Sequence, residues 1–163
     1  MNVTVMGTGY VGLVTGATLS DAGHQVTCLD IIEEKINELN QGKSPIFEPG
    51  LEELIKKGIQ TKTLRGSTDI ENCVRESDVT FICVGTPSNK NGSIDLNYIK
   101  SASSSIGRAL RVKEGEHTVI VKSTVVPLTT EETVLPTIIK LSLIHISEPT
   151  RPRLISYAVF CLK

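Results

Sequence analysis

An α/β fold built around a parallel β-sheet is the architecture that this sequence predicts. Along residues 1–140, short apolar runs rich in β-branched residues alternate with longer runs whose apolar residues recur at helical spacing. Strand–helix alternation of this kind favours a doubly wound sheet with helices on both faces. The 163 residues suit about one domain, and a hydrophobic content of 39% is enough for one core.

The predicted elements follow one another in a regular order. Nearly continuous apolar runs predict buried strands at residues 3–6, 25–29, 78–84 and 117–121. Helical spacing predicts helices at residues 10–22, 31–40, 49–58, 96–110 and 129–140. Pro49 lies near the start of the third helix and Gly58 just past its end, while Pro136 interrupts the last one.

The last 23 residues do not continue this pattern. Residues 141–151 read LSLIHISEPTR, which one frame of a common transposase-based sequencing adapter encodes, and residues 155–162 match the flow-cell primer that follows it. We therefore expect residues 141–163 to be an adapter-derived tail, and we leave their strand-like alternation out of the fold. The predicted domain is then residues 1–140, and its sheet is truncated before completion.

Charge and hydropathy exclude several classes of partner. Basic and acidic residues number 17 and 18, so there is no basic excess to bind nucleic acid or an anionic membrane. No apolar run approaches the roughly 18 residues of a membrane span, and the N-terminus has no signal-peptide pattern. We expect a cytoplasmic protein with reduced cysteines and no metal site, because its four cysteines and three histidines show no ligand spacing.

Gly7, Gly9 and Gly12 form a G-x-G-x-x-G pattern between the first predicted strand and the first predicted helix. In a Rossmann-like fold these glycines allow a tight turn, close approach of a pyrophosphate to the backbone, and close helix–sheet packing. The N–H groups of the helix N-terminus then bind the phosphates. Asp30 ends the second predicted strand, 18 residues after Gly12, where such folds place the acid that binds the adenine ribose.

Asp30 also bears on the choice of cofactor. A carboxylate about 4 Å from a 2′-phosphate repels it by about 4 kcal/mol at an effective dielectric near 20, which favours NAD over NADP. The alternative for Asp30 is a solvated turn carboxylate or a cap for the next helix.

Five segments, taken in order, resemble the UDP-glucose/GDP-mannose dehydrogenase family. They are GTGYVGL at 7–13, KI at 35–36, PIFEPGL at 45–51, CVGTP at 83–87 followed by DL at 95–96, and KSTV at 122–125. Within the family, the likeness is nearest to the UDP-glucose 6-dehydrogenases. The resemblance implies two NAD-dependent oxidations at the sugar C6, from alcohol to aldehyde and then through a cysteine-bound thioester to UDP-glucuronate. It also implies that the full-length protein binds UDP-glucose and is a homodimer or larger.

The same resemblance assigns five further residues to the cofactor site. It places Val11 along the pyrophosphate, Tyr10 beside the cofactor and Lys35 near the adenine ribose. Thr86 and Thr124 follow predicted strands at the edge where doubly wound sheets bind ligands. The resemblance assigns both to NAD, with Thr124 nearest the nicotinamide and the reacting centre. Structural alternatives are helix packing for Tyr10, a solvated helix charge for Lys35, and turn or strand-end roles for the two threonines.

The family's catalytic cysteine lies in a glycine-x-cysteine-x-proline-lysine segment, which this sequence does not contain. Cys28 and Cys83 fall in predicted strands, Cys73 in a helix or loop, and Cys161 in the expected tail. The central helix and the UDP-binding domain of the family are not matched either. We therefore expect the chain to be inactive by itself. The second oxidation has no covalent route without the cysteine, and the sugar loses binding energy and positioning without the UDP-binding domain.

Two alternatives and one departure stay open at this point. The nucleotide sugar is alternatively GDP-mannose or a UDP-N-acetyl-hexosamine, because most discriminating residues lie outside the matched segments. A non-catalytic NAD-binding Rossmann module is the other alternative, and it requires residues 141–163 to be genuine. The departure is Leu128, which follows Pro127 where many family members have glycine.

Overall fold

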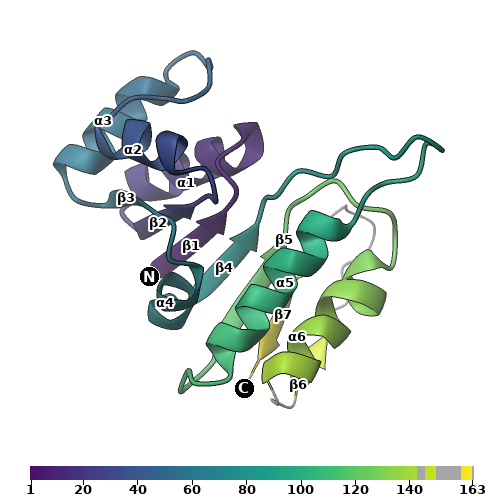
Figure 1. Cartoon of the computed structure of the whole chain (residues 1–163). Coiled ribbons are helices and arrows are strands. Elements are labelled where there is room, and N and C mark those ends of the chain that lie inside the picture. Colours follow the sequence, from purple (N-terminus) through teal and green to yellow (C-terminus); the bar gives the residue numbers. More distant parts are fainter. Residues whose placement is uncertain (143–145, 150–158, 163) are drawn as a thin grey trace.

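One β-sheet of strand order β3-β2-β1-β4-β5-β7-β6 runs through the molecule, as the computed structural model in Figure 1 shows. The structure describes residues 1–142, 146–149 and 159–162. Five strands are mutually parallel: β1 (Asn2–Met6), β2 (Gln25–Leu29), β3 (Leu64–Ser67), β4 (Val79–Ile82) and β5 (His117–Val121). The predicted α/β, Rossmann-like parallel sheet is therefore confirmed, with β1 paired on both sides.

Two further strands extend the sheet beyond β5. β7 (Val159–Leu162) pairs antiparallel with β5, and β6 (Ile146–Pro149) pairs antiparallel with β7. Both strands lie within residues 141–163, whose adapter origin stays a prediction.

Helices cover both faces of the parallel sheet. On one face, α1 (Tyr10–Asp21), α2 (Glu33–Asn40) and α3 (Leu51–Gln60) pack on β1 and β2 through an apolar core that includes Leu13, Leu39, Ile55 and Val5. The other face is covered by α4 (Ile70–Glu76), α5 (Asn97–Leu110) and α6 (Leu135–Ser142), whose core includes Val74, Ile106, Ile138 and Ile82. Figure 1 shows α5 and α6 side by side on that second face. No helix in the described ranges is long and apolar enough to cross a membrane.

Two details of the predicted elements are wrong. Gly58 lies inside α3 rather than past its end. A Cβ there would come within 2.7 Å of both the Leu64 Cβ and the Ser20 hydroxyl. Glycine is therefore needed for close packing of α3 on α1 and β3, not for ending the helix. The short strand β3 and the helix α4 were not predicted, because their sequences are too short and too polar to show a period.

The segment after β5 has an irregular backbone. Leu128 adopts a φ of 71°, in the left-handed region that glycine occupies without strain. This is the position after Pro127 at which many members of the resembled family have glycine. A π-helical turn, Thr130–Val134, then leads into α6. Pro136 in the first turn of α6 has no N–H for the regular helical ladder, and this accounts for the predicted interruption.

His117 at the start of β5 is buried, with 1% of its surface exposed. Its Nδ1 lies 2.9 Å from the Ser77 carbonyl oxygen and its Nε2 lies 2.9 Å from the Thr80 hydroxyl. A carbonyl only accepts, so Nδ1 carries the proton and Nε2 accepts from Thr80. Burial and the nearby Lys113 ammonium lower the His117 pKa to about 4, which makes the ring a neutral part of the core.

Candidate cofactor site

A cleft of about 620 Å³ opens at the carboxyl ends of β1, β2, β4 and β5. This is the edge at which doubly wound sheets bind ligands, and the volume lies in the range of small-molecule sites. Eight of the nine residues expected to bind the cofactor line it: Gly7, Gly9, Tyr10, Val11, Asp30, Lys35, Thr86 and Thr124. The ninth, Gly12, is buried behind the glycine-rich turn.

The three glycines occupy three different environments. Gly7 has a φ of +102°, and a Cβ there would lie 2.6 Å from the Cys83 carbonyl oxygen. A Cβ at Gly12 would lie 1.8 Å from the Gly7 carbonyl oxygen, so only glycine lets α1 lie this close to the turn. At Gly9 a Cβ would meet nothing within 4 Å, and the backbone is extended. Gly7 and Gly12 are thus required by the fold, whereas Gly9 leaves open space on the cleft side.

The N-terminus of α1 lines the cleft beside this open space, with Gly9, Tyr10 and Val11. The first helical hydrogen bond runs from the Leu13 N–H to the Gly9 carbonyl oxygen at 2.9 Å, so the N–H groups of the first turn have no partner within the helix. No acidic side chain lies in that turn. Tyr10 and Val11 are 60% and 47% exposed, so neither is a core residue. This arrangement suits a bound anion such as a pyrophosphate.

Asp30 is held at the end of β2 by three donors. Its Oδ2 accepts from the Thr8 N–H at 2.9 Å and from the Thr8 hydroxyl at 2.5 Å, and its Oδ1 accepts from the Ile32 N–H at 3.1 Å. Burial raises the pKa of this carboxyl, but the hydrogen bonds from Thr8 and Ile32 and the Lys35 charge outweigh it, and the net pKa is lowered. Asp30 is therefore an ionised, half-buried carboxylate at the cleft.

The loops after β4 and β5 are tied together beneath the cleft. The Ser123 hydroxyl lies 2.7 Å from the Val84 carbonyl oxygen, to which it donates. Beside it, Lys122 Nζ donates to the Thr15 hydroxyl of α1 at 3.2 Å. Thr86 is half-buried and Thr124 is exposed, and each lies near the start of its loop, shortly after the strand.

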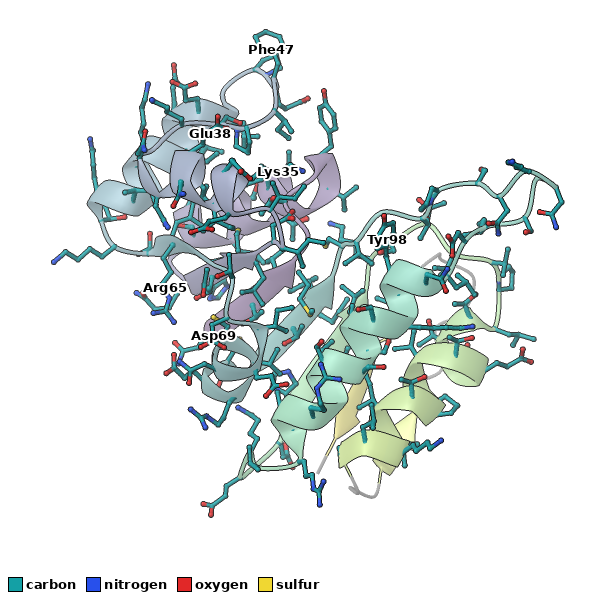
Figure 2. The ribbon with its side chains drawn as sticks, in the orientation of Figure 1. Lys35, Glu38, Phe47, Arg65, Asp69 and Tyr98 are labelled. Carbon is teal, nitrogen blue, oxygen red and sulfur yellow. The ribbon has the colours of Figure 1, made fainter. Side chains whose placement is uncertain are left out.

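Several lining residues were not predicted from the sequence. They include Thr8, Ile31, Ile32, Lys122 and Ser123, and a wall formed by the first turns of α5 with Tyr98, Ser101, Ala102 and Ser105. Figure 2 shows that Lys35 on α2 and Tyr98 on α5 belong to opposite halves of the molecule, while Phe47 projects from the loop between α2 and α3. No sequence signal marks the α5 residues, because they reach the cleft only through the packing of α5 on the sheet.

The three cysteines with described side chains have the properties of structural thiols. Cys28, Cys73 and Cys83 are buried and free. Burial raises the pKa of Cys28 and of Cys83 to about 12, and it also raises that of Cys73. An activated thiol has the opposite shift, because the thiolate is the nucleophile. Within the described ranges, no group of three or more His, Cys, Asp or Glu side chains is placed to hold a metal ion.

The fold and the cleft together define a dinucleotide-binding domain of the Rossmann type. Comparison with known families narrows this class. Residues 1–148 match the profile described as the UDP-glucose/GDP-mannose dehydrogenase family, NAD binding domain. The chain belongs to this family of NAD-dependent nucleotide-sugar dehydrogenases, and the predicted cofactor, NAD, is the one its domain binds.

Individual relatives cover most of this chain. A GDP-mannose 6-dehydrogenase of Pseudomonas aeruginosa is 51% identical over 138 residues, which are 85% of this chain and 32% of that protein. A UDP-glucose 6-dehydrogenase of Bacillus subtilis is 43% identical over 149 residues, 91% of this chain and 32% of that protein. The chain thus spans about a third of the length of these relatives.

Among solved structures, too, a GDP-mannose dehydrogenase is more similar to this chain than a UDP-glucose dehydrogenase. A GDP-mannose dehydrogenase from Pseudomonas aeruginosa, in a ternary complex, matches 87% of this chain and 33% of its own with a TM-score of 0.86 at 51% identity. A UDP-glucose dehydrogenase from Pyrobaculum islandicum matches 86% and 32% with a TM-score of 0.83 at 38% identity. The family expected from the sequence is confirmed. Of these relatives, however, the GDP-mannose enzymes are more similar than the UDP-glucose enzymes, contrary to the sequence-based likeness within the family.

Proposed function

We propose that the whole protein is a GDP-mannose 6-dehydrogenase and that this chain carries its NAD-binding domain. The observation that carries the choice of sugar is the identity of 51% to a GDP-mannose 6-dehydrogenase, against 43% to a UDP-glucose 6-dehydrogenase. The cleft itself supports the cofactor half of the proposal, because it brings a glycine-rich turn, a helix N-terminus and an ionised carboxylate to one edge of the sheet.

The residues present fit NAD along the length of the cleft. The open space at Gly9 admits the pyrophosphate against the backbone, and the N–H groups of Tyr10 and Val11 donate to it. Asp30 accepts a hydrogen bond from a hydroxyl of the adenine ribose, and Lys35 lines the same cleft, where its charge helps to lower the Asp30 pKa. Thr124, after β5, lines the same cleft, and we assign it to the nicotinamide half. NAD supplies the acceptor for the hydride that leaves the sugar C6.

UDP-glucose is the second candidate substrate. The Bacillus subtilis UDP-glucose 6-dehydrogenase matches 149 residues, a longer stretch than the 138 residues matched by the GDP-mannose relative. The motif segments of this chain resemble both groups. An activity assay with both sugars is therefore needed to distinguish the two substrates, because the cofactor cleft does not.

The cofactor half is tested on the purified 163-residue chain by calorimetry with NAD and NADP. We expect NAD to bind and NADP to bind more weakly. We expect no NADH from GDP-mannose or UDP-glucose, because the chain spans about a third of the length of its relatives and a sugar held by only part of a site loses binding energy and positioning. Sugar-dependent NADH formation by this chain would contradict that expectation.

The substrate half is tested on the source DNA. We propose that residues 141–163 derive from an adapter, so resequencing across codon 140 should give a reading frame that continues into further domains. The protein from that frame should form NADH with GDP-mannose and not with UDP-glucose, and the reverse preference would establish the second candidate. If codons 141–163 are genuine and end in a stop codon, a non-catalytic NAD-binding module replaces both enzyme proposals.

A further inference from the structure

We propose that Thr8, between the first two glycines of the motif, is a specificity-determining residue for NAD. It holds Asp30 so that one acceptor position on Oδ1 is left for the cofactor ribose. This inference rests on the proposed binding of NAD in the cleft. The motif specifies no residue type at position 8, so the inference gives a role to a residue that the motif leaves open.

The count of donors to Asp30 carries the argument. An ionised carboxylate offers about four lone-pair positions. The N–H and the hydroxyl of Thr8 both donate to Oδ2, at 2.9 and 2.5 Å, and these two bonds fill that oxygen. The Ile32 N–H takes one position on Oδ1 at 3.1 Å, and within the described part of the chain no fourth donor reaches the carboxylate. One acceptor position therefore remains, and it lies on Oδ1.

Thr8 itself has little freedom to move. It is 1% exposed, and the adjacent Gly7 N–H donates to the Leu29 carbonyl oxygen at 2.7 Å, which fixes the turn against β2. The two hydrogen bonds to Asp30 are charge-assisted, so they are stronger than bonds between neutral groups. They span 22 residues and join the glycine-rich turn after β1 to the end of β2.

A fixed and ionised carboxylate discriminates between the two cofactors. A ribose hydroxyl donates to the remaining position on Oδ1, whereas an ionised 2′-phosphate has no proton to donate and is repelled. Without the Thr8 hydroxyl, Oδ2 regains an empty acceptor position and Asp30 loses one of its three anchors. NAD then loses a preorganised hydrogen-bond acceptor. The Asp30 side chain can also rotate away from a 2′-phosphate, so that it repels NADP less.

The test compares three variants with the wild-type 163-residue chain by calorimetry with NAD and with NADP. Thr8→Val removes the hydroxyl and should weaken NAD binding about tenfold. It should also lower the ratio of NAD affinity to NADP affinity. Thr8→Ser keeps the hydroxyl and should stay within about twofold of wild type. Thr18→Val is the matched control, because the Thr18 hydroxyl donates to the Val14 carbonyl oxygen on the exposed side of α1, away from the cleft. The urea midpoint of each variant reports its fold, and Thr8→Ala replaces Thr8→Val if the valine variant does not fold.

Three outcomes would overturn the inference. The first is a hydroxyl-free variant that retains the wild-type ratio of NAD to NADP affinity, even if both affinities fall, since Thr8 would then only shape the turn. The second is a serine variant that behaves like the valine variant. The third is a wild-type chain that binds no NAD, which would also remove the cofactor half of the proposed function. The inference is supported if Thr8→Val lowers the ratio of NAD affinity to NADP affinity and Thr8→Ser retains the wild-type ratio.

Discussion

Replacing Gly9 and Gly12 with alanine in turn should separate cofactor binding from folding. At Gly9 the backbone is extended, with φ −79° and ψ −172°, and the added methyl group meets nothing within 4 Å. Alanine is therefore accommodated without strain, and we expect the free energy of unfolding to change by less than about 0.5 kcal/mol. The methyl group does, however, occupy the space that the proposed site gives to the pyrophosphate.

The effect of Gly9→Ala on binding can be bounded from hydrogen-bond energies. A phosphate oxygen held by a backbone N–H must move away from the new methyl group, which costs at least one hydrogen bond to a charged group. Such a bond contributes about 1.5–3 kcal/mol, so NAD affinity should fall by roughly 10- to 150-fold.

Gly12→Ala should behave in the opposite way. Its Cβ would lie 1.8 Å from the Gly7 carbonyl oxygen and 3.3 Å from the Cys83 Cβ, so α1 must shift away from the turn. Overpacking of this kind costs about 1–3 kcal/mol or more, out of the 5–15 kcal/mol that stabilises a typical domain. Urea unfolding and calorimetry with NAD on both variants make the comparison. A Gly9→Ala chain that binds NAD like wild type, or a Gly12→Ala chain as stable as wild type, would refute the reasoning.

Three further changes have expected outcomes. Asp30→Asn keeps the size of the side chain but removes its charge, so the preference for NAD over NADP should fall at least about tenfold in a binding titration; an unchanged preference would show that another group excludes the 2′-phosphate. His117 is neutral when folded and gains a proton when unfolded, so wild-type stability should be complete above the ordinary pKa near 6.5 and fall by about 3 kcal/mol as the pH drops towards 4. His117→Gln cannot titrate and should lose this part of the pH dependence in urea unfolding, whereas the control His24→Gln should keep it. Leu128→Gly relieves a left-handed backbone at an exposed site and should raise the free energy of unfolding by up to about 1 kcal/mol, while Val126→Gly in the same loop should lower it.

Most of the fold could be predicted because its signals are local. Strands β1, β2, β4 and β5 are buried in a parallel sheet, so each appears in the sequence as an apolar run. Strand β3 lies at the edge of the sheet and reads Leu-Arg-Gly-Ser, which carries no such signal. Gly58 was misplaced because its contacts with Ser20 and Leu64 override the usual tendency of glycine to end a helix.

Two kinds of signal predicted the lining of the cleft: a fixed spacing for the glycines and Asp30, and the family resemblance for Tyr10, Val11, Lys35, Thr86 and Thr124. Gly7, Gly9, Gly12 and Asp30 stand at intervals that the chemistry of dinucleotide binding requires, and the structure brings them to one edge of the sheet. The bonds between Thr8 and Asp30 were not predicted, because they depend on the register of β1 against β2. The α5 wall was not predicted either, since it reaches the cleft through tertiary packing. The sequence motifs also did not show that the GDP-mannose relatives are more similar than the UDP-glucose relatives, because the quoted motifs serve the cofactor that all members share.

The central position of β1 has a consequence for synthesis on the ribosome. One edge of β1 pairs with β2, which follows after one helix, but the other edge pairs with β4, and Val3 meets Val79 across 76 residues of chain. At translation rates of roughly 5–20 residues per second, β4 emerges about 4–15 s after β1. Throughout that interval the nascent chain presents an unpaired, β-branched strand edge. Chaperones that bind extended apolar segments, and neighbouring nascent chains on the same messenger, compete for that edge until β4 is made.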